Sequence, residues 1–154
     1  MADSIRELIQ KNIDTTLKLI SKIGGYNNDI VSVQRYEQSG NDFASCPVII
    51  QYPGDEGKKP GPVPLSSCDF TVYVGVYFKH DKTIDARSTD EIINSFLADV
   101  EKALMIDHTR GGYATSTFCS GNAIFQREEG EAYAGLFIEV GIIYDHDRND
   151  PTAQ

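Results

Sequence analysis

Residues 69–79 read DFTVYVGVYFK, the most regular stretch of the sequence. Alternation of apolar residues with period two predicts a β-strand that buries one face. The apolar positions of this strand are Phe70, Val72, Val74, Val76 and Phe78. The opposite face carries Tyr73 and Tyr77, so we expect both faces to be covered, and a partner is one source of such a cover.

A long loop is predicted just upstream, over residues 53–64. This segment reads PGDEGKKPGPVP, in which four of twelve residues are proline and three are glycine. Such a composition favours a flexible loop, and long loops inside compact domains are usually functional. We interpret the segment as a contact arm, with a plain flexible hairpin tip as the alternative. Two further strands are expected before it, over 30–36 and from Pro47 to Tyr52.

Two amphipathic helices are predicted, over residues 4–23 and 88–104. Each begins with a capping box, Ser4 with Glu7 and Ser88 with Glu91, in which the two residues bond each other's free N–H groups. Apolar residues then recur at helical spacing. They are Ile5, Leu8, Ile9, Ile13, Leu17 and Ile20 in the first helix, and Ile92, Ile93, Phe96, Leu97, Val100 and Leu104 in the second.

The last third of the chain predicts a loop, two strands and a polar end. The loop covers 105–114, and the antiparallel strands cover 114–127 and 132–145, joined by 128–131. Residues 146–154 read HDRNDPTAQ and are expected to be disordered. The resulting order, α-β-β-β-α-β-β, predicts an α+β fold: a mostly antiparallel sheet with both helices packed on one face. The whole chain, 1–154, is expected to form a single domain.

Composition excludes several classes of function. The 154 residues carry a formal net charge of −9, which argues against direct binding to the phosphates of nucleic acid. An acidic surface can still line a passage through which DNA slides. The three cysteines form no CxxC pair, which indicates free thiols. The N-terminal residues lack a signal-peptide pattern, and no apolar run is long enough to span a membrane.

No set of residues predicts a reaction, a cofactor or a metal. Asp145, His146 and Asp147 resemble a ligand cluster, but consecutive side chains on an extended chain point in opposite directions. Cys119 has no neighbour in sequence that would lower the pKa of its thiol. The Arg110-Gly111-Gly112 segment precedes a strand, whereas phosphate-binding loops precede a helix. We therefore expect a protein that is not an enzyme.

Several signatures together resemble the tail terminator (tail completion) proteins of long-tailed bacteriophages. They are the amphipathic first helix, the Pro-Val-Ile-Ile strand at 47–50 with its Pro/Gly-rich continuation, the 69–79 strand, and the closing strand 135–145. The signature with the most weight is the helix end LADVEKAL at 97–104 followed by DHTRGGYAT at 107–115. As a set these features are moderately specific.

The resemblance implies a structural virion protein, assembled in the host cytoplasm, that forms a hexameric ring at the neck. This ring would cap the tail tube, stop its growth and present a surface to the head-completion or connector protein. Its partners would be further copies, the tube protein and, in a contractile tail, the sheath protein, while DNA passes through the lumen without specific binding. No membrane is involved.

Contacts with these partners are expected from the exposed face of 69–79 and from the 53–64 and 105–114 loops. The expected contact residues are Asp55, Glu56, Lys58, Lys59, Tyr73, Tyr77, Arg110 and Tyr113. One alternative is a head–tail joining (stopper) protein of the same system. Two others are a small cytosolic enzyme or ligand-binding domain, and a non-viral oligomeric adaptor.

Overall fold

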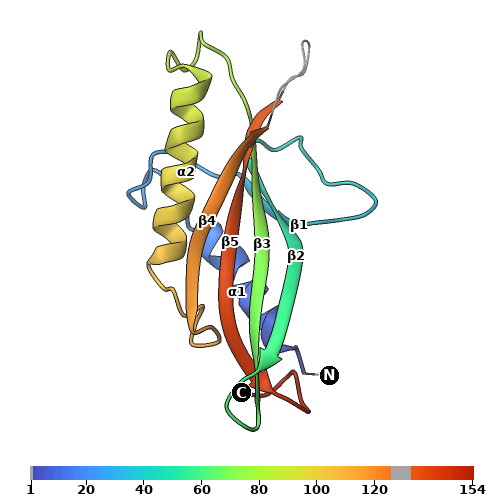
Figure 1. Ribbon diagram of the computed structural model, residues 1–154. Helices are drawn as coiled ribbons and strands as arrows, with labels where there is room; N and C mark the ends of the chain where they lie inside the picture. The colour runs from blue at the N-terminus through green and yellow to red at the C-terminus, as the bar shows by residue number, and fades with distance from the viewer. Residues whose placement is uncertain (1, 126–132) are drawn as a thin grey trace.

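The protein is an α+β fold in which five strands form one sheet and two helices pack against it, as predicted (Figure 1). This computed structural model describes residues 2–125 and 133–154. The elements are α1 (Ile5–Leu17), β1 (Ser32–Arg35), β2 (Val48–Pro60), β3 (Leu65–Lys79), α2 (Thr89–Met105), β4 (Ser116–Phe125) and β5 (Tyr133–Asp147). The predicted connection 128–131 lies outside the described residues.

The sheet has the strand order β1-β2-β3-β5-β4, with β3 at its centre. All neighbours are antiparallel except β1 and β2, which run parallel. On β3, the even-numbered residues Phe70 to Phe78 face the helices, and all of them are buried. The same side of β5 carries a buried row from Ala134 to Tyr144. The alternation in 69–79 therefore identified the core strand and its core face correctly.

Both helices lie over this one face, where their apolar stripes form a single core with the sheet. In Figure 1, α1 crosses behind the strands and α2 lies beside β4. The capping box of α2 is complete, with Ser88 and Glu91 each accepting the other's backbone N–H. At α1, Ser4 Oγ accepts the Glu7 N–H at 3.1 Å, but the Glu7 carboxylate forms an ion pair with Arg35.

The first helix is shorter than predicted. It ends at Leu17, and turns occupy residues 18–25, although Ile20 is still buried in the core. The apolar spacing that extended the prediction to residue 23 thus continues through a turn. Among the described residues, neither helix is long and apolar enough to cross a membrane.

The predicted loop over 53–64 is wrong for most of its length. β2 continues to Pro60 and pairs with β3 as far as Ser66, so only residues 61–64 form the tip of a long hairpin. A β-bulge between Pro53 and Glu56 inserts one extra residue into β2. The sequence hides this strand because β1 pairs only with 48–51, so β2 is an edge strand beyond Gln51 and tolerates proline there.

The chain end also differs from the prediction of disorder over 146–154. β5 runs to Asp147, whose N–H donates to the carbonyl of Ala153. The side-chain amide of Gln154 donates to the carbonyls of Tyr113 and Asp145. The N–H of Ile5 donates to the carbonyl of Pro151, so this segment folds back on its own chain and caps the first turn of α1.

Candidate interaction surface

Among the described residues, no helix lies on the second face of the sheet. Its side chains come from the odd-numbered residues of β3 and β5 and from their neighbours on β2 and β4. One end of this face is covered by the segment between β1 and β2. The Phe43 ring of this segment packs edge-on against the Tyr77 ring, and the two ring centroids are 5.1 Å apart. Tyr77 is consequently only 8% exposed, so its predicted contact with a partner is wrong.

The remainder of this face is exposed and strongly apolar. Tyr73, Phe118 and Ile143 are 39%, 42% and 36% exposed, and the acidic side chains of Asp69 and Glu139 flank them on the same face. We call these five residues the open sheet face. Of them, only Tyr73 was predicted as a contact residue, and the structure leaves it accessible.

Glycines on the strands make room for the aromatic rings that lie on this face. A Cβ at Gly54 would stand 2.9 Å from the Tyr73 ring, and a Cβ at Gly141 would stand 2.6 Å from the Phe118 ring. A β-carbon at Gly141 would therefore lift the Phe118 ring off the sheet, whereas one at Gly54 would also meet the Thr71 carbonyl oxygen at 2.6 Å.

Lys58 and Lys59, both expected to contact a partner, point to opposite faces of the hairpin. Lys58 is on the helix side, where its Nζ lies 3.1 Å from His146 Nε2 and 3.6 Å from a Glu56 oxygen. The Glu56 carboxylate also accepts a hydrogen bond from the Tyr144 hydroxyl. Burial and this hydrogen bond raise the pKa of Tyr144. Glu56 is therefore bound within its own chain.

Lys59 pairs with Ser67 across the hairpin, on the side of the open sheet face, and is exposed. A hollow of about 280 Å³ lies next to it, lined by Gly57, Lys59, Asp69 and Ile143 among others. Asp55 is exposed at the bulge. The hairpin therefore offers Lys59 and Asp55 to a partner, together with a hollow that continues the open sheet face.

Arg110, predicted to contact a neighbouring subunit, is instead completely buried at 0% exposure. Its backbone has a positive φ of 51°, and its Nη2 donates to the carbonyls of Leu104 and Asp107. The Leu104 carbonyl belongs to the last turn of α2, where the helix leaves acceptors free, and the Asp107 carbonyl belongs to the turn that follows. Arg110 is therefore a helix cap, and the prediction of a partner contact is wrong. Tyr113 is half-buried against the core.

Cys119 lies close enough to Arg110 for the guanidinium to favour the thiolate, but burial has the larger effect. The pKa of the Cys119 thiol is raised to about 11, so the thiol is protonated at neutral pH. Burial also raises the pKa of Cys46 and Cys68. This arrangement does not activate a nucleophile.

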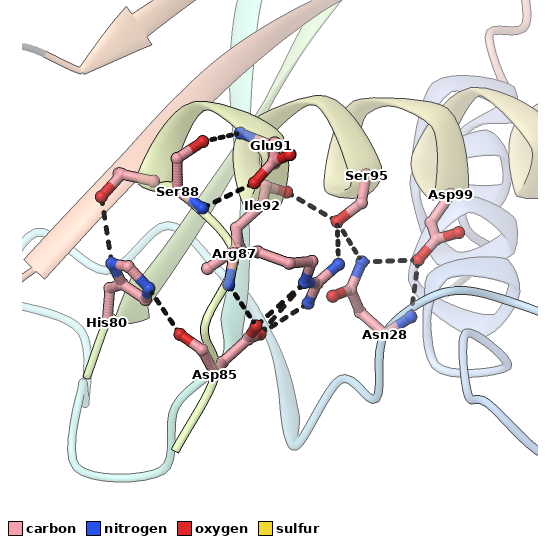
Figure 2. Close-up of polar contacts among 10 residues, drawn as sticks. Asn28, His80, Asp85, Arg87, Ser88, Glu91, Ile92, Ser95 and Asp99 are labelled. Atoms are coloured by element: carbon pink, nitrogen blue, oxygen red, sulfur yellow. Dashed lines mark hydrogen bonds and ion pairs between the residues drawn. The ribbon is translucent and has the colours of Figure 1, made fainter. Parts of the chain in front are cut away.

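A second hollow, of about 500 Å³, lies beside the first turn of α2. Phe78, Ile92 and Phe96 form part of its apolar lining. The polar side chains around it hydrogen-bond to one another (Figure 2). Arg87 donates to Asp85 and to Ser95, and the His80 ring lies between Thr89 Oγ1 and the Asp85 carbonyl. This network fixes the 80–88 loop to α2.

The same network continues into Asp99, which is buried in α2 and accepts four hydrogen bonds. The donors are the backbone and side-chain N–H groups of Asn27 and Asn28, at 2.9 to 3.0 Å. Figure 2 shows Asn28 between Ser95 and Asp99. Asp99 thus ties the segment that follows α1 to α2.

Within residues 2–125 and 133–154, no group of three or more His, Cys, Asp or Glu side chains is placed to hold a metal ion. Sequence reasoning missed Phe118 and Ile143 as exposed apolar residues. No protein-family model matches the sequence, and no curated protein matches it.

Proposed function

We propose that this chain is a structural subunit of a long-tailed bacteriophage, which forms a hexameric ring that caps the head-proximal end of the tail tube. The proposal combines the resemblance described above with one structural observation. That observation is the open sheet face, where Tyr73, Phe118 and Ile143 remain exposed on a regular sheet.

An exposed cluster of this kind favours association. Burial of apolar surface contributes roughly 25 cal/mol per Å², and aromatic residues are enriched at protein interfaces. A sheet is also a rigid support, so little conformational entropy is lost when a partner binds. The same face also carries the carboxylates of Asp69 and Glu139, which can pair with cationic groups of a partner.

Termination follows from the symmetry of the contacts. Tube rings stack through head-to-tail contacts that do not close along the axis, so a tube grows until a ring with a different outer surface is added. A terminator therefore needs one axial surface that matches the tube and another that rejects further tube rings. Unpaired charge or a clash on the second surface costs the wrong partner several kcal/mol.

Charge supports the passage of DNA through such a ring. Each subunit contributes a formal charge of −9, so six subunits form a strongly acidic assembly. Acidic walls do not displace the counterions of DNA, which passes without adhering.

Electron microscopy of the purified protein mixed with tube subunits tests the proposal. We expect rings at one end of each tube and tubes of limited length. Tubes that grow without limit and carry no ring would overturn it. Deletion of the gene separates terminator from stopper: overlong tails support the terminator, whereas normal tails that fail to join heads support the stopper.

The hairpin's part in this function is tested with a single lysine. Lys59→Glu is the cleaner variant, because Lys58 contacts Glu56 and His146 within the chain. We expect Lys59→Glu to weaken tube binding, and Lys82→Glu, at an exposed position in the 80–88 loop, to leave it unchanged. Equal binding of both variants would remove the hairpin from the mechanism.

A further inference from the structure

We infer that the open sheet face of one copy is covered by the outer surface of α1 from the next copy, an inference that rests on the ring-forming function proposed above. We define the outer surface of α1 as Lys11, Thr15, Lys18, Leu19, Lys22 and Ile23, from the helix and the turn that follows it. All six residues are exposed.

The helical part of this surface is the side of α1 that faces away from the sheet. Ile9, Ile13 and Leu17 lie at four-residue spacing and are buried in the core. Lys11, Thr15 and Lys18 are spaced by four and three residues, so they share one side of the helix, opposite the buried residues. The turn after the helix adds two exposed apolar side chains, Leu19 and Ile23, to the three lysines.

The two surfaces are complementary in charge. The outer surface of α1 carries Lys11, Lys18 and Lys22, whereas the open sheet face carries Asp69 and Glu139. Lys11 is paired with Asp3, but the described residues place no carboxylate in an ion pair with Lys18 or Lys22. Lys11 lies in α1, and Lys18 and Lys22 follow its last residue, so three lysines occur within 12 residues of a chain with 14 basic and 23 acidic residues.

The two surfaces are also complementary in kind. A sheet that exposes apolar side chains on its second face forms a stable layered structure when helices cover that face. The 13 residues of α1 give it a length of about 20 Å, which is enough to span the exposed part of the face between Asp69 and Tyr73 on β3.

The positions of the two surfaces favour a repeating contact. The outer surface of α1 and the open sheet face lie on opposite sides of the sheet, so each copy can use both at once. Two different surfaces in contact make a head-to-tail interface, which closes into a ring when the rotation per copy divides the circle. A contact between two open sheet faces would instead produce a dimer and stop.

Charge reversal on each surface tests the inference. The first variant carries Lys18→Glu and Lys22→Glu, and the second carries Asp69→Lys and Glu139→Lys. We expect each variant alone to need a concentration roughly tenfold higher or more for assembly, because like charges then face each other. Lys82→Glu should assemble like the unmodified chain. Thermal unfolding of each variant checks that the fold is retained.

Mixing the two variants provides the decisive measurement. In the mixture, the reversed helix surface of the first variant meets the reversed sheet face of the second, and the two native surfaces also meet. We expect assembly to be restored in the equimolar mixture and in a single chain carrying all four substitutions. Native mass spectrometry and sedimentation velocity report the assembled species.

The outcomes separate this inference from the proposed function. If the unmodified chain forms no ring, with or without tube subunits, the proposed function fails. If the unmodified chain forms rings and the Lys18→Glu, Lys22→Glu variant forms them equally well, only the assignment of the surfaces fails. A loss of assembly confined to the Asp69→Lys, Glu139→Lys variant would show that the open sheet face contacts something other than the outer surface of α1 and would overturn the inference.

Discussion

The ring of Phe118 lies across Gly141 of the neighbouring strand, with its Cζ 2.6 Å from the point where an alanine Cβ would stand. Gly135, on the same strand, would place a Cβ only 2.4 Å from the carbonyl oxygen of Val76. The two glycines thus differ in what an added methyl group would meet: a half-exposed ring in one case and the backbone in the other.

We therefore expect Gly141→Ala and Gly135→Ala to behave differently. The Phe118 ring can swing into solvent, so Gly141→Ala should lower the free energy of unfolding by about 1 kcal/mol or less. It should nevertheless weaken assembly, because the open sheet face changes shape. Gly135→Ala forces the backbone to move and should cost roughly 2–4 kcal/mol. Urea denaturation measures both, and equal losses would contradict this account of the two sites.

We expect Arg110 to contribute to the stability of the folded chain. Replacing it with alanine removes a buried side chain and two hydrogen bonds to the end of α2, so we expect a loss of about 2–4 kcal/mol in the free energy of unfolding. Lys59→Ala, at an exposed site, should change that free energy by less than about 0.5 kcal/mol. If Arg110→Ala unfolds like the unmodified protein but fails to assemble, Arg110 contacts a partner after all.

Asp99 should be needed to hold residues 27–28 on α2. In Asp99→Ala the N–H groups of Asn27 and Asn28 lose their acceptor, and we expect a loss of roughly 2–4 kcal/mol. Hydrogen exchange should show faster exchange at the backbone amides of these two residues. Asp55→Ala, which removes the same charge at an exposed site, should leave both measurements unchanged.

Acid should destabilise the fold through Asp107. Hydrogen bonds from Thr109 and from the Gly111 N–H lower the pKa of this carboxyl group to about 2. A carboxyl with a lowered pKa in the folded state contributes stability above its ordinary pKa near 3.8, and this contribution is lost as the pH falls toward 2. Asp85, held by Arg87, has a pKa lowered to about 2 and acts in the same direction.

We expect the midpoint of urea unfolding to fall between pH 4 and pH 2, and to fall less steeply in Asp107→Asn. The raised pKa of Asp14, caused mainly by burial, acts in the opposite direction, because the protonated carboxyl is favoured in the folded state. An identical pH slope in Asp107→Asn and the unmodified protein would refute the role assigned to Asp107.

Cys119 should react slowly in the folded protein. With a pKa raised to about 11, very little thiolate exists at pH 7.5, and the side chain is half-buried. Iodoacetamide should label Cys119 much more slowly in the native protein than in the urea-unfolded chain, as read by mass spectrometry of its peptide. Fast labelling in the native state would revive the alternative of a small enzyme with a cysteine nucleophile.

The fold was predictable wherever local pattern and burial agree. The alternation of apolar residues in 69–79 and the capping box at Ser88 depend on neighbouring residues alone. The core face of β3 and the start of α2 were therefore predicted correctly. The burial of Arg110 was not predictable, because a glycine-rich segment after a helix ordinarily lies in solvent. Asp99 and Asn28 are 71 residues apart, and no local pattern links them. The exposure of the Phe118 ring depends on which loop covers the sheet, which only the tertiary structure decides.

The single extra residue of the bulge between Pro53 and Glu56 sets the orientation of the whole outer hairpin. Before it, odd-numbered residues of β2 face the helices; after it, even-numbered ones do, which places Lys58 on the helix side and Lys59 on the side of the open sheet face. Losing one residue there would exchange the two lysines and invert every side chain from Glu56 to Pro60. One codon inserted or deleted at this position would thus exchange the side chains that the hairpin presents on its two faces.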